Sequence, residues 1–531
     1  MRKPKFVTAQ EVVSMLKDGD TFGMMGMTMA GAPEEIMKEM EKSFLETGHP
    51  RDLTFVHASG LTDKVNGMNR FGHEGFLKRV IGSHWGLSPA MMDLIANNKV
   101  EAFCMPIGIV SHLYNSVSRR EPGMITKVGL GTFIDPRYEG GKMNELTKSL
   151  GEDMIDLLTI DGEEYLRYKY TKLDYLIIRG TYADESGNIT TIDEACVLGL
   201  LQLVLAAKRF GAKVVVQVRQ KVGDGAIPPK EVDIPGVFVD YVVVAQDPFE
   251  NHRQSSGWYQ DDTYSGYRRA PMAELDVMPM NERKVIGRRA LMQLKQNAVI
   301  NVGTGIPNDA IGPVLAEEDL MDDIMITVES GVYGGVPAGG MDFGVSQNTV
   351  ALISLSDQFD YYEGSGVDYT FMGCGELDQY GNVNATKMGR IAPGSGGFVD
   401  ITNSAKNVVF CSTFMGKGLK VAFDEEKGVE IVQEGKICKC VKEVMQVSFN
   451  GKLANQRGHN VYYVTERCMF KINEDGPELI EVARGIDLQK DILDKMEFAP
   501  KISPNIAEMP TCIYRDGKFG LKEFIEAKGE F

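Results

Sequence analysis

The chain repeats part of itself, and this internal repeat limits the folds that it can adopt. Seven residue identities recur at a constant separation of 194 positions. The matched pairs are Asp174 with Asp368, Tyr175 with Tyr369, Asp184 with Asp378, Gly187 with Gly381, Asn188 with Asn382, Val214 with Val408 and Val215 with Val409. An unchanged separation over about 40 residues is typical of a duplicated structural unit rather than of chance similarity. The repeat therefore predicts two related halves.

Each half also shows the local pattern of an α/β protein, in which short strands alternate with helices. The five apolar or β-branched residues at 324–328 predict a strand that is buried on both faces, as in a parallel sheet. Helices are predicted at 9–17, with Thr8 as the N-cap, and at 194–210. A strand, a glycine loop and a Pro-initiated helix occur near both Pro33 and Pro307.

These patterns predict two tandem related open α/β domains with mainly parallel sheets. We place the first half at 1–246 and the second half at 282–531. The polar stretch 247–281 lacks periodicity and is interpreted as the linker between the halves.

Composition excludes several classes of function. The formal net charge is −17 and the pI is about 5.1, which argues against nucleic acids and anionic membrane surfaces as partners. Eight cysteines without a CxxC pair predict a reduced, cytoplasmic protein. Seven histidines without ligand spacing predict no metal site, and no apolar run is long enough to span a bilayer.

One carboxylate stands out at a strand end. Glu329 follows the predicted strand and is followed by five glycines within about ten residues. A Glu at a strand end is usually solvated or an ordinary cap, and glycines after a strand usually just turn the chain. However, Ser330 and Gly331 match Ser59 and Gly60, and this alignment puts Ala58 opposite Glu329. A residue needed only to finish the strand should occur in both halves, so the asymmetry favours a functional Glu329.

The surrounding sequence narrows the chemistry. Neither a dinucleotide-binding GxGxxG, a phosphate-binding P-loop nor a GxSxG elbow is present after the predicted strands. A lone carboxylate can act as a nucleophile toward a thioester and form a covalent acyl intermediate. The developing oxyanion would need N–H donors, and glycine loops such as the one holding Gly26 and Gly31 can supply them. This combination suits acyl or CoA exchange.

Several motifs along nearly the whole chain resemble those of class I CoA-transferases. The most similar group is the single-chain branch of propionate and short-chain acyl-CoA:acetate CoA-transferases. The motifs are the Glu-Ser-Gly at 329–331, the glycines and proline at 334–340, and the stretches at 129–137, 179–188, 394–398 and 465–468. The loop at Met25, Gly26 and Met27 departs from the family's Gly-Gly-Phe pattern, which bears on the acyl-chain preference.

The resemblance implies a fold, a mechanism and an assembly. The fold would be the CoA-transferase or sugar-phosphate-isomerase-like fold, with the active site in the cleft between the halves. Glu329 would form a mixed anhydride and then a glutamyl-CoA thioester, giving ping-pong kinetics between an acyl-CoA and a carboxylate such as acetate. No metal or permanently bound cofactor would be needed, since CoA serves as substrate and covalent intermediate. Family members are homo-oligomers, so a dimer or tetramer is expected.

The resemblance also implies binding residues, for each of which a plain structural role is the alternative. Asn382 would orient the glutamyl carbonyl, although its repeat partner Asn188 shows that the turn alone can explain it. Met25 and Met27 would line the acyl pocket, with ordinary core packing as the alternative. Expected contacts to CoA are Gly303, Thr304, Gly305, Ile306, Pro307, Gly396, Gly397, Phe398, Lys417 and Lys420.

Two other functions stay open at this point. An acyl-CoA hydrolase could use the same framework with water as the acceptor. A metabolite-sensing protein that binds acyl-CoA without reacting is the non-catalytic alternative, and the presence of Glu329 opposite Ala58 argues against it.

Overall fold

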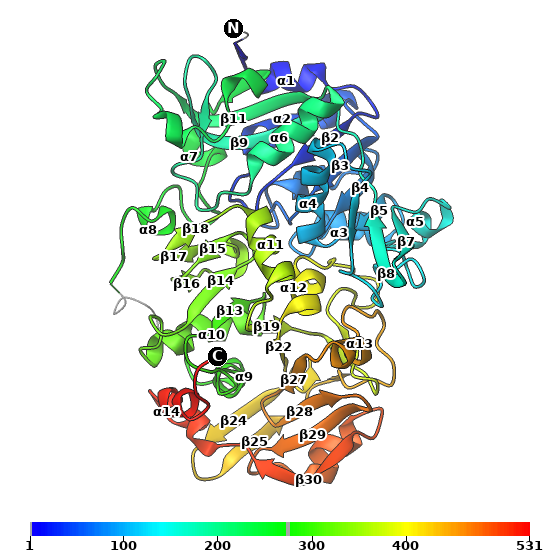
Figure 1. Cartoon of the computed structure of the whole chain (residues 1–531), viewed down its shortest axis with the longest axis vertical. Helices are drawn as coiled ribbons and strands as arrows, with labels where there is room; N and C mark the ends of the chain where they lie inside the picture. The colour runs from blue at the N-terminus through cyan, green and yellow to red at the C-terminus, as the bar shows by residue number, and fades with distance from the viewer. Residues whose placement is uncertain (1–2, 272–276) are drawn as a thin grey trace.

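The computed structural model describes residues 3–271 and 277–531 and places two sheets one above the other along the long axis (Figure 1). The first half forms a sheet of nine strands in the order β1-β12-β11-β9-β2-β3-β4-β5, with β10 beside β9. All neighbours along this order are parallel, and only β10 is antiparallel. The strands are β1 Lys5–Val7, β2 Thr21–Met24, β3 Leu53–His57, β4 Leu77–Gly82, β5 Glu101–Cys104, β9 Tyr175–Ala183, β10 Ile189–Thr190, β11 Lys213–Lys221 and β12 Tyr241–Val244.

The second half forms a sheet of ten strands in the order β18-β15-β14-β13-β19-β22-β27-β28-β29-β30. The run from β14 to β27 is parallel, whereas hairpins extend it at both ends. The strands are β13 Val299–Val302, β14 Met325–Val328, β15 Val332–Tyr333, β18 Ala351–Leu352, β19 Tyr369–Gly373, β22 Asn407–Cys411, β27 Asn460–Val464, β28 Cys468–Asn473, β29 Gly476–Val482 and β30 Lys501–Glu508.

Small sheets and helices complete the fold. The small-sheet strands are β6 Met124–Thr126, β7 Ile155–Ile160, β8 Glu163–Tyr168, β16 Val336–Pro337, β17 Ser346–Gln347, β20 Glu376–Leu377, β21 Val383–Asn384, β23 Met415–Gly416, β24 Lys420–Asp424, β25 Gly428–Gln433 and β26 Ile437–Cys438. The helices are α1 Ala9–Met15, α2 Glu34–Thr47, α3 Pro89–Ala96, α4 Ile107–Ser118, α5 Glu145–Ser149, α6 Leu200–Phe210, α7 Pro248–Asn251, α8 Asp262–Ser265, α9 Glu282–Leu291, α10 Ile306–Glu317, α11 Leu355–Gly364, α12 Phe398–Ser404, α13 Gly451–Gln456 and α14 Leu521–Glu526. Among the described residues, no helix combines the length and the apolar character needed to cross a membrane.

The predicted repeat is visible in matching hydrogen bonds. In the first half, the Asp184 carboxylate accepts from the backbone and side-chain N–H groups of Asn188 at 2.8 Å each. In the second half, Asp378 accepts from the same two groups of Asn382 at 2.9 and 3.1 Å. The first turn follows β9 and the second follows the short strand β20 just after β19. Strands β9 and β19 each pair in parallel with the next repeated strand, β11 and β22. The duplication of the sequence is therefore a duplication of structure.

The structure contains both predicted helices, but the second begins later than predicted. Helix α1 begins after Thr8, whose hydroxyl accepts from the N–H of Glu11 while the Glu11 carboxylate accepts from Thr8 in return. The predicted helix at 194–210 is wrong at its start, because α6 begins only at Leu200. Leu198 and Gly199 have φ angles of 60° and 71°, which is a left-handed conformation. The right-handed helix can therefore begin only after them.

The polar stretch 247–281 bridges the halves where the structure describes it. It contains α7 and α8 rather than irregular chain alone. The carboxylate of Asp342, in the second half, accepts from the hydroxyl of Ser256 at 2.7 Å and from the N–H of Gly257 at 2.9 Å. The part of the predicted linker at 272–276 lies outside the described residues, and the domain boundaries themselves stay predictions.

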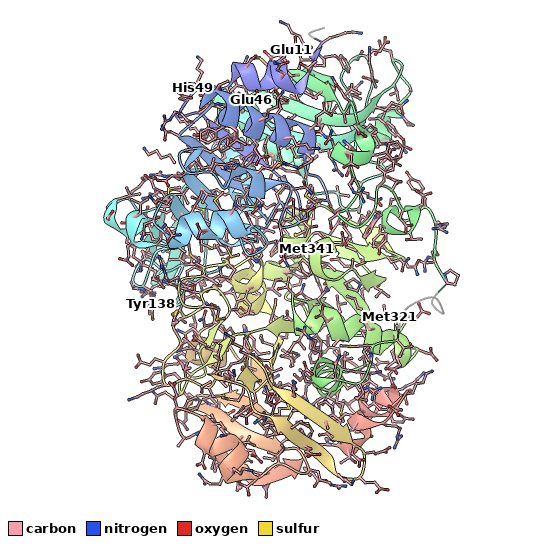
Figure 2. All side chains as sticks on the ribbon, turned by 180° about the vertical axis from the view of Figure 1, so that it is seen from behind. Glu11, Glu46, His49, Tyr138, Met321 and Met341 are labelled. Atoms are coloured by element: carbon pink, nitrogen blue, oxygen red, sulfur yellow. The ribbon has the colours of Figure 1, made fainter. Side chains whose placement is uncertain are left out.

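The halves also meet through helices. Helix α4 of the first half packs against α11 and α12 of the second, and one hydrophobic core continues across this boundary. Gly108 permits the close approach, since a Cβ at this position would lie 2.5 Å from the ring of Phe359. The packing brings the loops at the carboxyl ends of strands from both sheets to the same level of the molecule, where Met341 also lies (Figure 2).

Candidate active site

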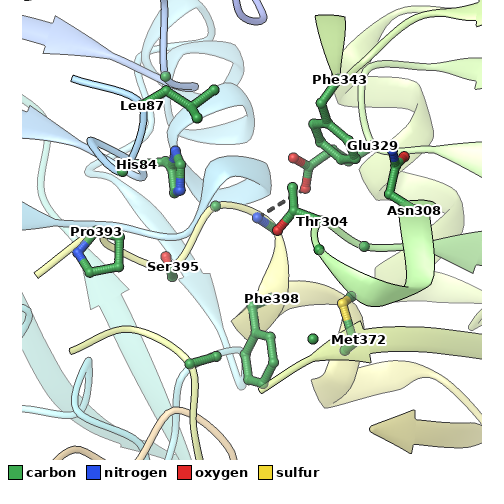
Figure 3. Close-up of a pocket in the computed structure, with 18 of the residues that line it drawn as sticks. His84, Leu87, Thr304, Asn308, Glu329, Phe343, Met372, Pro393, Ser395 and Phe398 are labelled. Carbon is green, nitrogen blue, oxygen red and sulfur yellow. Dashed lines mark hydrogen bonds between the residues drawn. The ribbon is translucent and has the colours of Figure 1, made fainter. Parts of the chain in front are cut away.

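Glu329 occupies the position directly after the buried strand β14. The chain turns sharply there, because Gly331 has a φ of 95° and a Cβ on it would lie 2.1 Å from the carbonyl oxygen of Ile353. The hydroxyl of Ser330 donates to the carbonyl of Gly344 and anchors the turn. Strand end and turn together aim the Glu329 carboxylate into an open cavity (Figure 3).

The cavity has a volume of about 620 Å³ and is lined by residues of both halves. The first half contributes Met27, Thr28, Ser59, Gly60, His84, Gly86 and Leu87. The second half contributes the loop after β13, the residues around Met341 and Phe343, the end of β19, and the loop at 393–398. A site between two domains that combines apolar walls with a few polar groups is typical of small-molecule binding.

The loop at 393–398 is tied to the first half by its backbone. The N–H of Trp85 donates to the carbonyl of Pro393 at 2.6 Å, and the N–H of Gly396 donates to the carbonyl of Ser83 at 3.0 Å. The N–H of Ile107 donates in turn to the carbonyl of Gly396 at 3.1 Å. The shape of this loop therefore depends on main-chain contacts between the halves.

The same loop contacts the Glu329 carboxylate. The N–H of Gly397, at the start of α12, donates to Oε2 of Glu329 at 3.0 Å (Figure 3). A Cβ on Gly397 would lie 2.2 Å from this oxygen, so only glycine permits the approach. The hydrogen bond therefore supplies a fixed donor at the carboxylate.

Burial and this hydrogen bond act on Glu329 in opposite directions. Burial raises the pKa of Glu329 to about 7, and the Gly397 N–H opposes the increase by stabilising the charged form. No ion pair to Glu329 occurs within residues 3–271 and 277–531. A carboxylate that is enclosed, unpaired and open to a cavity is suited to react with a ligand.

Two further acidic side chains are buried on the helices α11 and α12, next to this loop. Glu363 on α11 and Asp400 on α12 are buried near the first-half residue Gly108. Burial and the neighbouring carboxyl raise the pKa of Asp400, and burial raises the pKa of Glu363 to about 8. Burial thus favours the uncharged form of both groups next to Glu329.

The structure brings many of the predicted site residues together at the cavity. Glu329 and Met27 line it, as do the predicted CoA contacts on two loops. These contacts are Gly303, Thr304, Gly305, Gly396, Gly397 and Phe398. Met27 belongs to the first half and reaches the second, since a Cβ on Gly344 would lie 2.1 Å from its Cγ. Ile306 and Pro307 begin α10 and lie outside the lining.

Three other predicted site residues are buried in the protein and do not line the cavity. Gly26 and Gly31 are buried, and Cβ atoms on them would meet Leu61 at 2.0 Å and Leu198 at 2.6 Å. Met25 is 2% exposed and belongs to the hydrophobic core, as its alternative interpretation had it.

Asn382, Lys417 and Lys420 are likewise absent from the cavity lining. The amide of Asn382 is occupied by its turn, because Oδ1 accepts from the N–H of Gly451 at 3.2 Å and Nδ2 donates to Asp378. Lys417 and Lys420 are exposed at the β23 and β24 strands. The structure does not bring these three residues to Glu329.

Several lining residues were not identified from the sequence. His84 follows β4 at the carboxyl end of the sheet, and applying the strand-end rule to β4 would have found it. Arg283 is in the first turn of α9 and pairs with Asp309 from α10. Phe343 and Met372 gave no signal, because an apolar residue at a cavity looks like any core residue in sequence.

The described residues hold no group of three or more His, Cys, Asp or Glu side chains that could bind a metal ion. The cavity brings together the Glu329 carboxylate, the Gly397 N–H donor and the imidazole of His84. This set suits nucleophilic attack on a carbonyl carbon.

Comparisons with known proteins point to the same chemistry. The Coenzyme A transferase family matches residues 6–245. The chain is 42% identical to "Caffeate CoA-transferase" of Acetobacterium woodii over 97% of this chain and 98% of that protein. It is 38% identical to "Acetate CoA-transferase YdiF" of Escherichia coli K12 over 97% and 96% of the two chains. The crystal structure of the acyl-CoA transferase YdiF from Escherichia coli O157:H7, described as a thioester complex with CoA, has a TM-score of 0.90, with 37% identity over 98% and 97% of the chains.

Proposed function

Because the chain belongs to the single-chain family I CoA-transferases, we propose that it moves CoA between an acyl-CoA and a carboxylate through a glutamyl-CoA thioester on Glu329. The observation that carries the proposal is the unpaired Glu329 carboxylate, which faces the cavity between the halves and accepts from the N–H of Gly397. Its repeat partner Ala58 lacks any such group.

The proposed reaction begins with attack of a Glu329 oxygen on the thioester carbonyl carbon. A C–O bond forms, the C–S bond breaks, and CoA leaves as a thiolate beside a mixed anhydride. The thiolate then attacks the glutamyl carbonyl carbon, and the original acyl group leaves as a carboxylate. An incoming carboxylate repeats these steps in reverse, so atoms and charge balance without another reactant.

Gly397 supports the steps in which the glutamyl carbon is attacked, through its N–H group. The enzyme-derived oxygen that it contacts becomes the carbonyl oxygen of the anhydride and of the thioester, and it gains charge each time the glutamyl carbon is attacked. A preorganised donor at such an oxygen stabilises the transition state without reorganisation.

The remainder of the cavity suits the long CoA chain. We place the pantetheine arm along Gly303, Thr304 and Gly305, where small residues let a ligand approach the backbone. Arg283 is the cationic side chain in the lining that can meet a phosphate. Contacts from Lys417 and Lys420 to the nucleotide end, outside the cavity, stay predictions.

The acyl subsite is proposed to accept short-chain acyl groups with acetate as the acceptor. Met27, Met372 and Met388 line the cavity, and methionine adapts to different acyl shapes. A larger aromatic acyl group is the second candidate, because the relative with 42% identity is named for caffeate. The cytoplasmic location and the dimer or tetramer stay predictions from the sequence.

The test replaces Glu329 by Gln and by Ala. Both variants should lose exchange activity by several orders of magnitude, because no other group can form the covalent intermediate. Mass spectrometry of the native protein mixed with acetyl-CoA should show CoA attached to the peptide that holds Glu329. Most of the activity surviving in either variant would refute the assignment.

The same assay separates transfer from hydrolysis. A panel of acetyl-CoA, butanoyl-CoA and caffeoyl-CoA is mixed with the protein, with and without a carboxylate acceptor. A transferase forms a new acyl-CoA only when the acceptor is present. Release of free acid at the same rate without it would favour the hydrolase.

A further inference from the structure

His84 lies on the first-half wall of the cavity, and the proposed reaction steps assign it no role. The residue follows β4, and Figure 3 shows its ring on the opposite side of the cavity from Glu329. Its backbone is fixed, because it pairs with Gly394 and the neighbouring Trp85 N–H donates to Pro393. The imidazole is therefore held at a defined place facing the reacting carboxylate.

Both ring nitrogens of His84 lack a protein partner in the part of the chain that the structure describes. Two glycines pack closely against the ring and help to fix it, since a Cβ on Gly60 would lie 3.0 Å from Nδ1 and a Cβ on Gly86 would lie 2.8 Å from Nε2. His84 is half-buried and lines the cavity, so a substrate oxygen there can accept a hydrogen bond from the ring.

The charge state of His84 matches a donor to an uncharged carbonyl. Burial lowers the pKa of His84 to about 4, so the ring is neutral at physiological pH and offers one N–H and one acceptor nitrogen. A cationic side chain at this place would attract the Glu329 carboxylate and weaken it as a nucleophile. A neutral N–H avoids this effect and still stabilises an oxygen that gains charge.

His57 provides an internal contrast. It lies just before Ala58, stacks on Phe55 and makes a hydrogen bond of 2.7 Å between Nδ1 and the carbonyl of Ser59. It is 1% exposed and does not line the cavity. Nε2 of His57 is buried without a hydrogen-bond partner among the described residues and cannot be reached from the cavity, whereas the ring of His84 lines the cavity, where a substrate can contact it.

We propose that His84 is a further catalytic residue, whose N–H donates to the carbonyl oxygen of the substrate-derived acyl group during attack by Glu329. The inference rests on the proposed function. Gly397 then serves the glutamyl oxygen and His84 serves the substrate oxygen, so each carbonyl of the mixed anhydride has its own donor. His84 transfers no proton; the oxygen gains negative charge as the new C–O bond forms and loses it when the C–S bond breaks.

The test compares His84→Leu with His84→Gln. Leucine has a similar volume and no donor, so kcat should fall about 100-fold, in the range for loss of one oxyanion donor. Glutamine keeps an N–H and should retain activity within about tenfold of the wild type. The KM for acyl-CoA should change little in either variant, because the contact strengthens only in the transition state.

His49→Leu is the matched control, since His49 is exposed and lies near the far end of the first half (Figure 2). Its activity should equal that of the wild type. Thermal unfolding of each variant shows whether the fold is intact.

The rate at which CoA becomes attached to Glu329 separates the two proposals. A wild-type protein that never forms the adduct would remove the proposed function. Adduct formation in His84→Leu at the wild-type rate, while the wild type does form it, would overturn the role of His84 alone. Equal loss in His84→Leu and His84→Gln would also overturn it, because a role in packing would then explain both.

Discussion

The two halves share a scaffold and differ in what they place after the same strand. After β3 the first half has Ala58, which is 1% exposed and whose carbonyl accepts from the hydroxyl of Ser83. After β14 the second half has Glu329, which faces the cavity. The next two residues, Ser and Gly, are the same in both halves. A single side chain thus separates a structural strand end from a reactive one.

The difference also divides the work between the halves. The second half holds Glu329, the proposed nucleophile, and the Gly397 donor, while the first half supplies the opposite wall with Met27 and His84. Neither half alone encloses the cavity. In the proposed reaction, one copy therefore carries the covalent chemistry and the other covers it.

The largest expected effect in this comparison belongs to Gly397→Ala. The added methyl group would lie 2.2 Å from Oε2 of Glu329 and 3.1 Å from both Phe359 and Ile401. The loop must therefore shift, and the N–H of residue 397 moves away from the carboxylate. We expect kcat to fall about 10²- to 10³-fold, as for loss of an oxyanion donor. The decrease in kcat is measured from the initial rates of acyl exchange.

Gly223→Ala in the first half is the control for this substitution. Nothing lies within 4 Å of its Cβ position, so activity and thermal stability should match the wild type. If Gly397→Ala kept a third or more of the wild-type kcat, the contact to Glu329 would have no catalytic value.

A smaller effect is expected from the paired turns. Asn188→Ala and Asn382→Ala each remove matched hydrogen bonds to an aspartate, which should cost about 1–2 kcal/mol of stability per turn. Both variants should show similar decreases in thermal midpoint and keep kcat within about threefold. A much larger loss of kcat in Asn382→Ala would show that the second-half turn serves catalysis beyond its structural role.

The last expected effect concerns stability alone and arises at the acid pair where the halves meet. The pKa of Glu363 is raised to about 8, so the folded protein keeps a proton that the unfolded chain releases near its ordinary pKa of 4.5. Stability should therefore fall as the pH rises from about 5 to 8. Glu363→Gln removes this titration and should flatten the decline in thermal midpoint over that range.

Asp322→Asn serves as the control, because Asp322 is exposed. Its thermal midpoint should follow the wild-type pH dependence. An unchanged pH dependence in Glu363→Gln would show that the carboxyl does not retain its proton in the folded state.

Much of this architecture was predictable, because the signals are local or repeated. The constant separation of 194 predicted the duplicated turns, and the buried run at 324–328 predicted β14 and the position of Glu329. The antiparallel hairpins at the sheet edges were not predicted, because the parallel pattern of the centre says nothing about how a sheet ends. The start of α6 was wrong because two left-handed residues break an apolar run that otherwise suits a helix.

Residues of the site were predicted from the sequence only where they belong to a recognisable motif. The glycines at 303–305 and 396–397 line the cavity, and their motifs are visible in sequence. His84 reaches the cavity only through the packing of the halves, and Arg283 comes from a helix of the second half that lies 46 positions before Glu329 in the sequence. Gly26 and Met25 are close to the cavity-lining Met27 in sequence, yet the loop turns them into the core.

The backbone ties between Ser83, Trp85, Ile107 and the loop at 393–396 have a consequence for how such a protein can diversify. Peptide groups are the same in every residue except proline, so these ties survive changes of most side chains on either loop. The wall around the acyl group can then be rebuilt, residue by residue, while the nucleophile keeps its aim. New substrates become reachable without redesign of the machinery that reacts with them.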